Sequence, residues 1–255
     1  MGINKLQAFL KGTHEAIIIS SEENRRYFTG FPSTHGYLVV TKDEAVFFTD
    51  SRYIEAAQKT VKNCKAKLLT KVSEEIKEYI KDRKIIKIYS EREHITVSVS
   101  DYLKTVFLPC KVTPSKKLEA EITRIRRIKT EEQKEKILTA QKIAEDAFQH
   151  ILTFIKPGVT EKQIALELDF YMLSHGAEAL SFETIAVAGK KSSMPHGVPD
   201  ENVVKDGDFI TMDFGAVYDG YHSDMTRTVA VGNITDEQKK IYEIVLKAQK
   251  SALAV

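Results

Sequence analysis

Short apolar and β-branched runs alternate with segments of helical periodicity through the first half of the chain. The runs predict strands at residues 16–20, 37–40, 45–49, 65–69 and 85–89. Between them, apolar positions at helical spacing predict helices at residues 52–60 and 73–82. Alternation of this kind is typical of an α/β domain with a largely buried sheet.

The second half contains helices whose first residues are marked by the sequence. Thr130 and Gln133 form a capping box, in which the two side chains bond to amides at the start of a helix. One apolar face then continues for about six turns until a Pro-Gly pair ends the helix. The same pattern predicts further helices that begin after Thr160 and Thr235.

Three strands are predicted between the second and third of these helices. They cover residues 182–188, 208–217 and 221–231, and the last two flank Asp219 and Gly220. An Asp-Gly pair between β-prone runs predicts a two-residue type I′ hairpin, because that turn needs positive φ at both positions.

The hairpin register brings two aspartates to one face of the sheet. A turn that pairs Tyr218 with Tyr221 places Asp213 opposite Thr226, with Asp224 as a diagonal neighbour on the same face. Their Cβ atoms would lie ~7–8 Å apart, which suits carboxylates that share two metal ions ~3.5–4 Å apart. Two aspartates beside a hairpin are more often solvated turn residues. Asp213, however, lies in an otherwise apolar strand, where an unpaired carboxylate is costly.

A charged segment marks the predicted domain boundary. Residues 118–129 contain no turn residue and indicate a linking helix, so we predict domains at residues 1–125 and 126–255. The halves differ in charge, since residues 1–128 carry a net +8 and residues 129–255 a net −6. Acidic residues interrupt the basic ones and no aromatic residues are interleaved, which argues against a nucleic-acid partner.

Composition excludes further classes of protein. The 255 residues are 29% charged and 42% hydrophobic, as expected for a globular chain. No apolar run approaches the ~18 residues of a membrane span, and the first residues contain no signal-peptide core. Cys64 and Cys110 form no close redox or metal-type pair, which favours free thiols in a reducing cytoplasm.

The hairpin resembles the metal-binding hairpin of the pita-bread metallopeptidases, peptidase family M24. This family includes Xaa-Pro dipeptidase, aminopeptidase P, methionine aminopeptidase and creatinase. The matching segments are Asp-Phe-Gly-Ala, which begins at Asp213, and Ser-Asp-Met-Thr-Arg-Thr, which contains Asp224. The resemblance implies that these aspartates bind a dinuclear metal site, that Thr226 and Arg227 support them, and that the Pro-His-Gly-Val-Pro loop supplies a substrate-facing histidine, His196.

The first half resembles the creatinase-type N-terminal domain. The matching residues are Asn24, Tyr-Phe-Thr-Gly-Phe at residues 27–31 and Thr-Asp-Ser-Arg-Tyr at residues 49–53. Methionine aminopeptidases lack this domain, so the Xaa-Pro dipeptidase or aminopeptidase P type is favoured. The implied fold is α/β (α+β), with a creatinase-like N-terminal domain followed by the first half of a pita-bread catalytic domain, and the implied assembly is a homodimer.

The ligand set of the family is larger than the one found in this sequence. The family's site uses two aspartates, a histidine and two glutamates, and the last three come from the second half of the catalytic domain. No histidine follows His222, so we expect the catalytic domain to be truncated at its C-terminal side. Two carboxylates alone hold a divalent ion weakly, and we expect low metal occupancy.

The resemblance implies a cytoplasmic metallopeptidase that cleaves Xaa-Pro bonds in dipeptides or at peptide N-termini. In such a site two metal ions hold a bridging hydroxide that attacks the carbonyl before proline. A carboxylate-rich site favours hard ions, so manganese is expected first, with cobalt or zinc as alternatives. We expect the chain by itself to be an incomplete, inactive form. The alternative is a non-catalytic, peptidase-like binding or dimerisation module.

Overall fold

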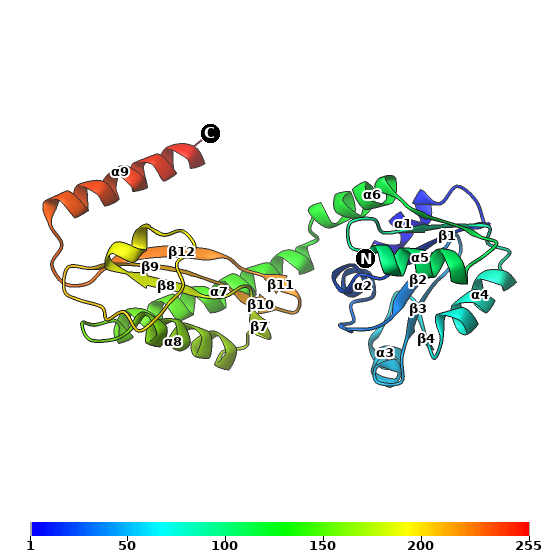
Figure 1. Ribbon diagram of the computed structural model, residues 1–255, viewed down its shortest axis with the longest axis horizontal. Helices are drawn as coiled ribbons and strands as arrows, with labels where there is room; N and C mark the ends of the chain where they lie inside the picture. Colours follow the sequence, from blue (N-terminus) through cyan, green and yellow to red (C-terminus); the bar gives the residue numbers. More distant parts are fainter. Residues whose placement is uncertain (1, 255) are drawn as a thin grey trace. The chain divides into compact units, whose positions relative to one another are not determined.

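A computed structural model describes residues 2–254 of the chain (Figure 1). The chain forms two compact units, of which the first ends at Ile128 and the second begins at Lys129. Among the described helices, none combines the length and the apolar character needed to cross a membrane.

The first unit is built on a six-stranded mixed sheet. Its strands are β1 (Glu15–Ile19), β2 (Tyr37–Thr41), β3 (Ala45–Thr49), β4 (Lys65–Leu68), β5 (Lys87–Ser90) and β6 (Lys111–Pro114). They are arranged in the order β4-β3-β2-β1-β5-β6. Only β2 runs antiparallel to its neighbours. The five predicted strands are confirmed with small shifts at their ends, whereas β6 was not predicted.

Helices cover both faces of this sheet. They are α1 (Ile3–Phe9), α2 (Glu22–Thr29), α3 (Ile54–Thr60), the π-helical segment η1 (Val72–Ile76), α4 (Lys77–Asp82), α5 (Val97–Val106) and α6 (Lys116–Arg127). Ile17 packs with Leu118 of α6 on one face, and Ile18 packs with Ile80 of α4 on the other. Because strand side chains alternate between faces, consecutive residues enter separate cores, and the predicted buried sheet is confirmed.

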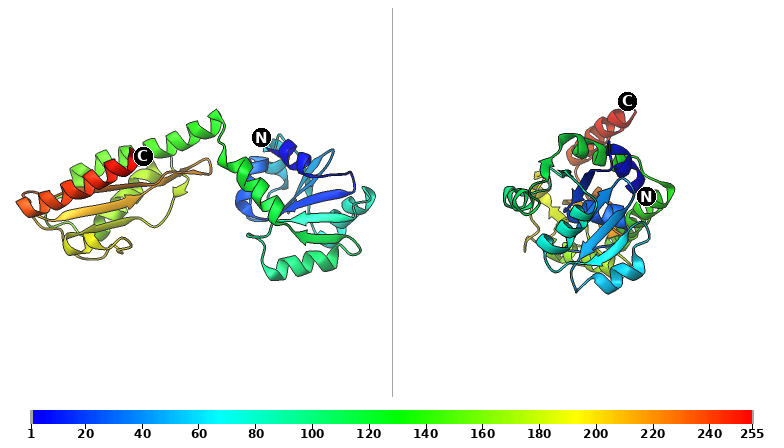
Figure 2. Two further views of the ribbon diagram at one scale, coloured as in Figure 1. Left: turned by 90° about the horizontal axis from the view of Figure 1, so that it is seen from above. Right: turned by 90° about the vertical axis from the view of Figure 1, so that its right-hand side faces the viewer.

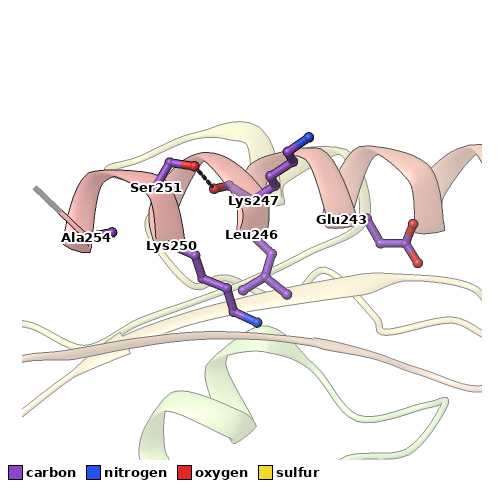
Figure 3. A pocket seen from close by; sticks show the side chains of 6 residues that line it. All are labelled: Glu243, Leu246, Lys247, Lys250, Ser251 and Ala254. Atoms are coloured by element: carbon purple, nitrogen blue, oxygen red, sulfur yellow. Dashed lines mark hydrogen bonds between the residues drawn. The ribbon is translucent and has the colours of Figure 1, made fainter.

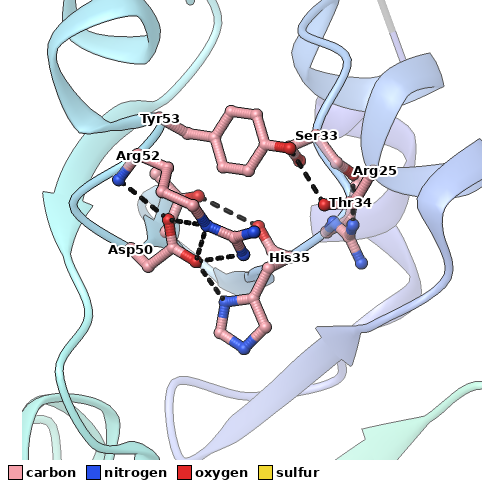
Figure 4. A network of polar contacts seen from close by, with 8 residues as sticks. Arg25, Ser33, Thr34, His35, Asp50, Arg52 and Tyr53 are labelled. Carbon is pink, nitrogen blue, oxygen red and sulfur yellow. Dashed lines mark hydrogen bonds and ion pairs between the residues drawn. The ribbon is translucent and has the colours of Figure 1, made fainter.

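Polar side chains gather around the loop of residues 31–36 (Figure 4). Three of the contacts that hold this loop are Arg25 Nη2 to the Ser33 carbonyl at 2.6 Å, Tyr53 Oη to Thr34 Oγ1 at 2.9 Å and Asp50 Oδ2 to His35 Nδ1 at 3.4 Å. The segment at residues 49–53, which resembles the creatinase-type domain, therefore fixes the chain immediately before β2.

The second unit begins with two helices that pack together. They are α7 (Glu131–Phe154) and α8 (Glu161–Ser174), and α9 (Asp236–Leu253) follows near the end of the described chain. All three begin with the predicted capping boxes, in which the Thr hydroxyl accepts from the amide of the Gln three residues later and the Gln side chain bonds to the Thr amide.

The strands of the second unit form two small antiparallel sheets. The first contains β8 (Ile185–Ala188), β9 (Phe209–Phe214) and β12 (Met225–Ala230), with β9 in the centre, and the second contains β7 (Ala179–Leu180), β10 (Ala216–Tyr218) and β11 (Tyr221–His222). Helices α7 and α8 cover one face, whereas α9 lies on the opposite side (Figures 1 and 2). Met212, Phe214 and Met225 point into the core beneath α7 and α8, as predicted.

The two long strands predicted around the hairpin are interrupted. A Cβ atom at Gly215 would lie 2.1 Å from the Ser223 carbonyl oxygen, so glycine permits this close approach. The Ala216 amide donates to Ser223 Oγ at 3.0 Å, and Ser223 Oγ reaches the Ala140 carbonyl of α7 at 3.1 Å. The prediction of unbroken strands was wrong, because this side chain replaces part of the ladder and ties the hairpin to α7.

Helix α9 is attached to the sheet by its first turns. Gln238 Nε2 donates to the Gly207 carbonyl at 2.8 Å, and the Tyr242 ring stacks on Phe209 with centroids 6.0 Å apart. No residue of α9 is buried. Its later turns line an open groove, with Leu246 and Lys250 directed toward the strands beneath (Figure 3).

Candidate functional site

Asp213 of β9 is held by Thr226 of β12. The two residues are directly opposite each other, as the hairpin register predicts, and Thr226 Oγ1 donates to Asp213 Oδ1 at 2.6 Å. Asp213 is half-buried and Thr226 is exposed. Within the described part of the chain no hydrogen bond involves Asp213 Oδ2, so this oxygen is available to a ligand.

The turn that sets this register has the predicted geometry. Asp219 has φ of 46° and Gly220 of 77°, which are the positive values that a type I′ turn requires. Asp219 Oδ2 lies 2.9 Å from Lys136 Nζ of α7. Asp219 is therefore a turn residue, as the sequence indicated, and its carboxylate also contacts α7.

Asp224 lies on the same face as Asp213. It is exposed, and it stands in the gap between β11 and β12. The next residue, Met225, pairs with Phe214 and is buried beneath α7 and α8. Because side chains alternate along a strand, Asp224 belongs to the face opposite these helices, where Asp213 and Thr226 lie.

The loop that carries His196 packs against that face. Val187 of β8 is paired with Thr211, two residues before Asp213, which corresponds to about 7 Å along the strand. A Cβ atom at Gly197 would lie 2.9 Å from Val187 Cγ1, so the loop backbone rests on this valine. His196 itself is exposed at the tip. The structure thus places the backbone of the histidine loop on the face of β8 and β9 that carries Asp213.

Arg227 is directed to the other face. It is paired with Met212, and its guanidinium lies 5.9 Å from the Phe148 ring of α7. Its Nη1 donates to the Thr226 carbonyl at 2.8 Å. Of the two residues expected to support the metal ligands, the structure brings only Thr226 to Asp213.

The two aspartates fit a divalent metal in chemistry but not in number. Carboxylate oxygens are the ligands that hard divalent ions prefer. Across residues 2–254, no three His, Cys, Asp or Glu side chains come together in a group that could hold a metal. Among the described residues, Asp213 and Asp224 are therefore too few to make up a metal site by themselves.

Two residues near the site were not identified from the sequence. Glu161, at the first position of α8, and Lys191, in the 3₁₀ segment η2 (Gly189–Ser193), hold the base of the histidine loop. In a sequence, an acidic residue directly after an N-cap is explained by its favourable interaction with the helix dipole. The sequence therefore gave no indication that Glu161 is completely buried. Lys191 reads as a surface lysine, because only the fold places Glu161 beside it.

Two family models match the chain. The Creatinase/Prolidase N-terminal domain matches residues 3–128, and Metallopeptidase family M24 matches residues 135–255. A Xaa-Pro dipeptidase from Pyrococcus furiosus is 33% identical to this chain, and the match covers 98% of this chain and 70% of the relative.

Solved structures are similar over both units. A Xaa-Pro dipeptidase from Bacillus anthracis has a TM-score of 0.89 and 37% identity, over 97% of this chain and 69% of the other. An X-Pro aminopeptidase from Thermotoga maritima has a TM-score of 0.88 and 32% identity, over 94% of this chain and 69% of the other. The chain therefore spans 69–70% of the lengths of these three proteins.

Proposed function

Because the chain belongs to metallopeptidase family M24 and carries the Creatinase/Prolidase N-terminal domain, we propose that its site serves the hydrolysis of Xaa-Pro bonds. The substrates are dipeptides or the N-termini of longer peptides that carry proline in second position. The observation that supports this proposal is the Thr226-held carboxylate of Asp213, which shares the face of the sheet opposite α7 and α8 with Asp224 and the His196 loop.

We propose that Asp213 and Asp224 are carboxylate ligands to two divalent metal ions, with manganese as the first choice and cobalt or zinc as alternatives. When bound, such metal ions lower the pKa of a water molecule and make a nucleophile available near neutral pH. The hydrogen bond from Thr226 fixes one oxygen of Asp213, which reduces the reorganisation needed when the other oxygen binds.

His196 is proposed to act on the substrate carbonyl. The bond before proline carries no amide hydrogen, so a site that recognises this bond directly must act on its carbonyl oxygen. An exposed imidazole on the loop beside Asp213 can donate a hydrogen bond to that oxygen, and the bond becomes stronger as negative charge develops there.

We propose that this chain by itself binds metal weakly, so that it is inactive at low metal concentration and turns over slowly only when excess metal fills the site. A site with two protein carboxylates leaves most of an ion's coordination to water, whereas tight oxygen sites use six or more ligands. We further propose that it functions in the cytoplasm, where the free thiols Cys64 and Cys110 stay reduced, and that it forms a homodimer.

Hydrolysis of Ala-Pro tests the function, with Ala-Ala as the control substrate. With excess manganese, the chain is expected to cleave Ala-Pro slowly and in preference to Ala-Ala. Asp224→Asn should abolish this cleavage. Asp219→Asn is the matched control, because it removes the same charge from the same hairpin and asparagine tolerates the positive φ of that position. Equal activity in both variants would contradict the assignment of Asp224.

The same assay separates the alternative function. A non-catalytic binding module is favoured by the partial ligand set and by the apolar side chains that α9 leaves exposed, such as Ile244 and Val245. If the folded chain binds manganese through both aspartates and still cleaves no Ala-Pro, the binding module replaces the enzyme as the better account.

A further inference from the structure

A buried carboxylate holds together the segments at the base of the His196 loop. Glu161 is fully buried at the first position of α8. Its Oε1 accepts from the Ala188 amide and from Asn202 Nδ2, both at 2.8 Å. Its Oε2 accepts from Lys191 Nζ at 2.6 Å and from the Asp200 amide at 3.3 Å. The Glu161 carboxylate thus connects the end of β8, Lys191 at the start of the loop, and residues 200–202, where the chain returns to α8.

Lys191 joins the start of the loop to its end. Its Nζ also donates to the Val198 carbonyl at 2.9 Å and lies 2.9 Å from Asp200 Oδ2. The hydrogen bond to Glu161 raises the pKa of the Lys191 ammonium, and the hydrogen bond from Lys191 lowers the pKa of the Asp200 carboxyl. His196 lies between residues 191 and 198, so it belongs to a ring of chain that this ammonium closes.

The loop has little apolar packing of its own. Met194 is 55% exposed and Val198 is 74% exposed. Two features fix the tip, namely the bond from the Gly197 amide to the Met194 carbonyl at 3.1 Å and the contact of Gly197 with Val187. Because a loop with little apolar packing depends on its hydrogen bonds for order, the ionic contacts at its base act together with these two features to hold His196 in place.

We propose that Glu161 and Lys191 are positioning residues for His196 in the cleavage of Xaa-Pro bonds. This inference rests on the proposed function, because the position of His196 affects the reaction only if the site cleaves Xaa-Pro bonds. A catalytic donor displaced by about 1 Å loses on the order of 10²-fold in rate. The partly buried contact between Glu161 and Lys191 keeps the loop on the face of β8 and β9 that carries Asp213.

Three variants of the full chain test the positioning role. Lys191→Met removes the ammonium and keeps much of the side-chain volume, Lys191→Arg keeps the charge, and Lys190→Met removes an exposed charge from the neighbouring residue as the matched control. Amide hydrogen exchange over residues 192–200 reports on the loop, and exchange in β9 and α7 reports on the fold. Hydrolysis of Ala-Pro with manganese gives kcat and KM separately.

The expected result distinguishes the variants. Lys191→Met should speed exchange in the loop by about tenfold or more, leave exchange in β9 unchanged and lower kcat more than it raises KM. Lys191→Arg should restore both properties, and Lys190→Met should change neither. If Lys191→Met loses protection from hydrogen exchange throughout the second unit, Glu161→Gln is used in its place. That substitution removes the carboxylate charge and keeps a side chain of the same shape.

Each contrary outcome has a separate meaning. Unchanged loop exchange in both Lys191→Met and Glu161→Gln would overturn the role of the contact. A loosened loop with unchanged kcat and KM would overturn the positioning role and leave the proposed function intact. If wild-type protein cleaves no Ala-Pro while its loop is protected, the proposed function fails, and the positioning role fails with it.

Discussion

Thr226 of the edge strand β12 donates a hydrogen bond of 2.6 Å to Asp213 of the central strand β9. This bond fixes one carboxylate oxygen before any ligand binds. Loss of such a support for a metal ligand typically costs about 10–100-fold in affinity. We therefore expect Thr226→Val to weaken manganese binding by that factor, measured by the paramagnetic resonance signal of free manganese.

The neighbouring threonine provides a control for this variant. Thr228 lies two residues further along the same strand, and its hydroxyl lies 3.2 Å from Thr211 Oγ1 and does not bond to Asp213. Thr228→Val should leave manganese affinity unchanged. Equal weakening in both variants would mean that strand packing, and not the bond to Asp213, controls the site.

Gly215 is required by the break in the hairpin strands. Its missing Cβ makes room for the Ser223 carbonyl, a backbone atom that cannot rotate away. We expect Gly215→Ala to lower the free energy of unfolding of the second unit by about 1–3 kcal/mol, measured by urea denaturation. Gly12→Ala, where nothing lies within 4 Å of the new Cβ, should produce no comparable overpacking penalty. A stability of Gly215→Ala equal to wild type would contradict the close approach.

The capping boxes of α7 and α9 should respond differently to the same substitution. An N-cap threonine is worth about 0.5–2 kcal/mol. In α9, which buries no residue, Thr235→Ala should reduce helicity through the first turns. In α7, buried side chains such as Ala147 and Ile151 should preserve the helix, so that Thr130→Ala lowers only the free energy of unfolding. Cα chemical shifts measure the helicity and urea denaturation measures the free energy of unfolding, and unchanged shifts in Thr235→Ala would show that α9 does not depend on its cap.

The histidine loop should lose its ionic contacts at both ends of the pH range. Lys191 holds the pKa of Asp200 below its usual value of 3.8, so this contribution is present above pH 3.8 and is lost as pH falls through the lower folded-state pKa. The pKa of Lys191 is raised above 10.5, so its contribution is present below that pH and is lost at higher pH. Between these limits the side-chain ¹³C shifts of Lys191 and Asp200 should stay constant. Asp200→Asn should remove the acid-side change, and an identical acid transition in that variant would contradict its assignment to Asp200.

The features predicted correctly depend on a few neighbouring residues. Three capping boxes and the Asp219–Gly220 turn were predicted at the residues where they occur, because each is a local hydrogen-bond or φ requirement. The register between Asp213 and Thr226 follows from that turn by counting alone. The fold class and the family were also confirmed.

Helices α2 and α5 were not predicted, because the sequence signals of the first were overlooked and those of the second were misleading. Ser21 and Gly30 are the N-cap and the left-handed C-cap of α2, but its highly polar sequence hid the apolar face. In α5, the alternation of valine and serine from Val97 onward has the period of a strand. There the Thr96 cap and the burial of Leu103 outweigh that pattern.

The remaining errors concern contacts between distant segments. The break at Gly215 depends on the Ser223 backbone and the Ala140 carbonyl, which no local pattern relates. The burial of Glu161 depends on the return of the chain 39 residues later at Asp200. Such information is contained in the packing and not in the periodicity of any single element.

Manganese binding to wild type, Asp213→Asn, Asp224→Asn and Asp219→Asn tests the central claim most directly. Wild type should bind weakly but measurably at the site that these two aspartates share. The first two variants should each lose about tenfold or more in affinity, while Asp219→Asn binds as wild type does. Equal affinity in all four proteins would contradict the claim that Asp213 and Asp224 form the metal site.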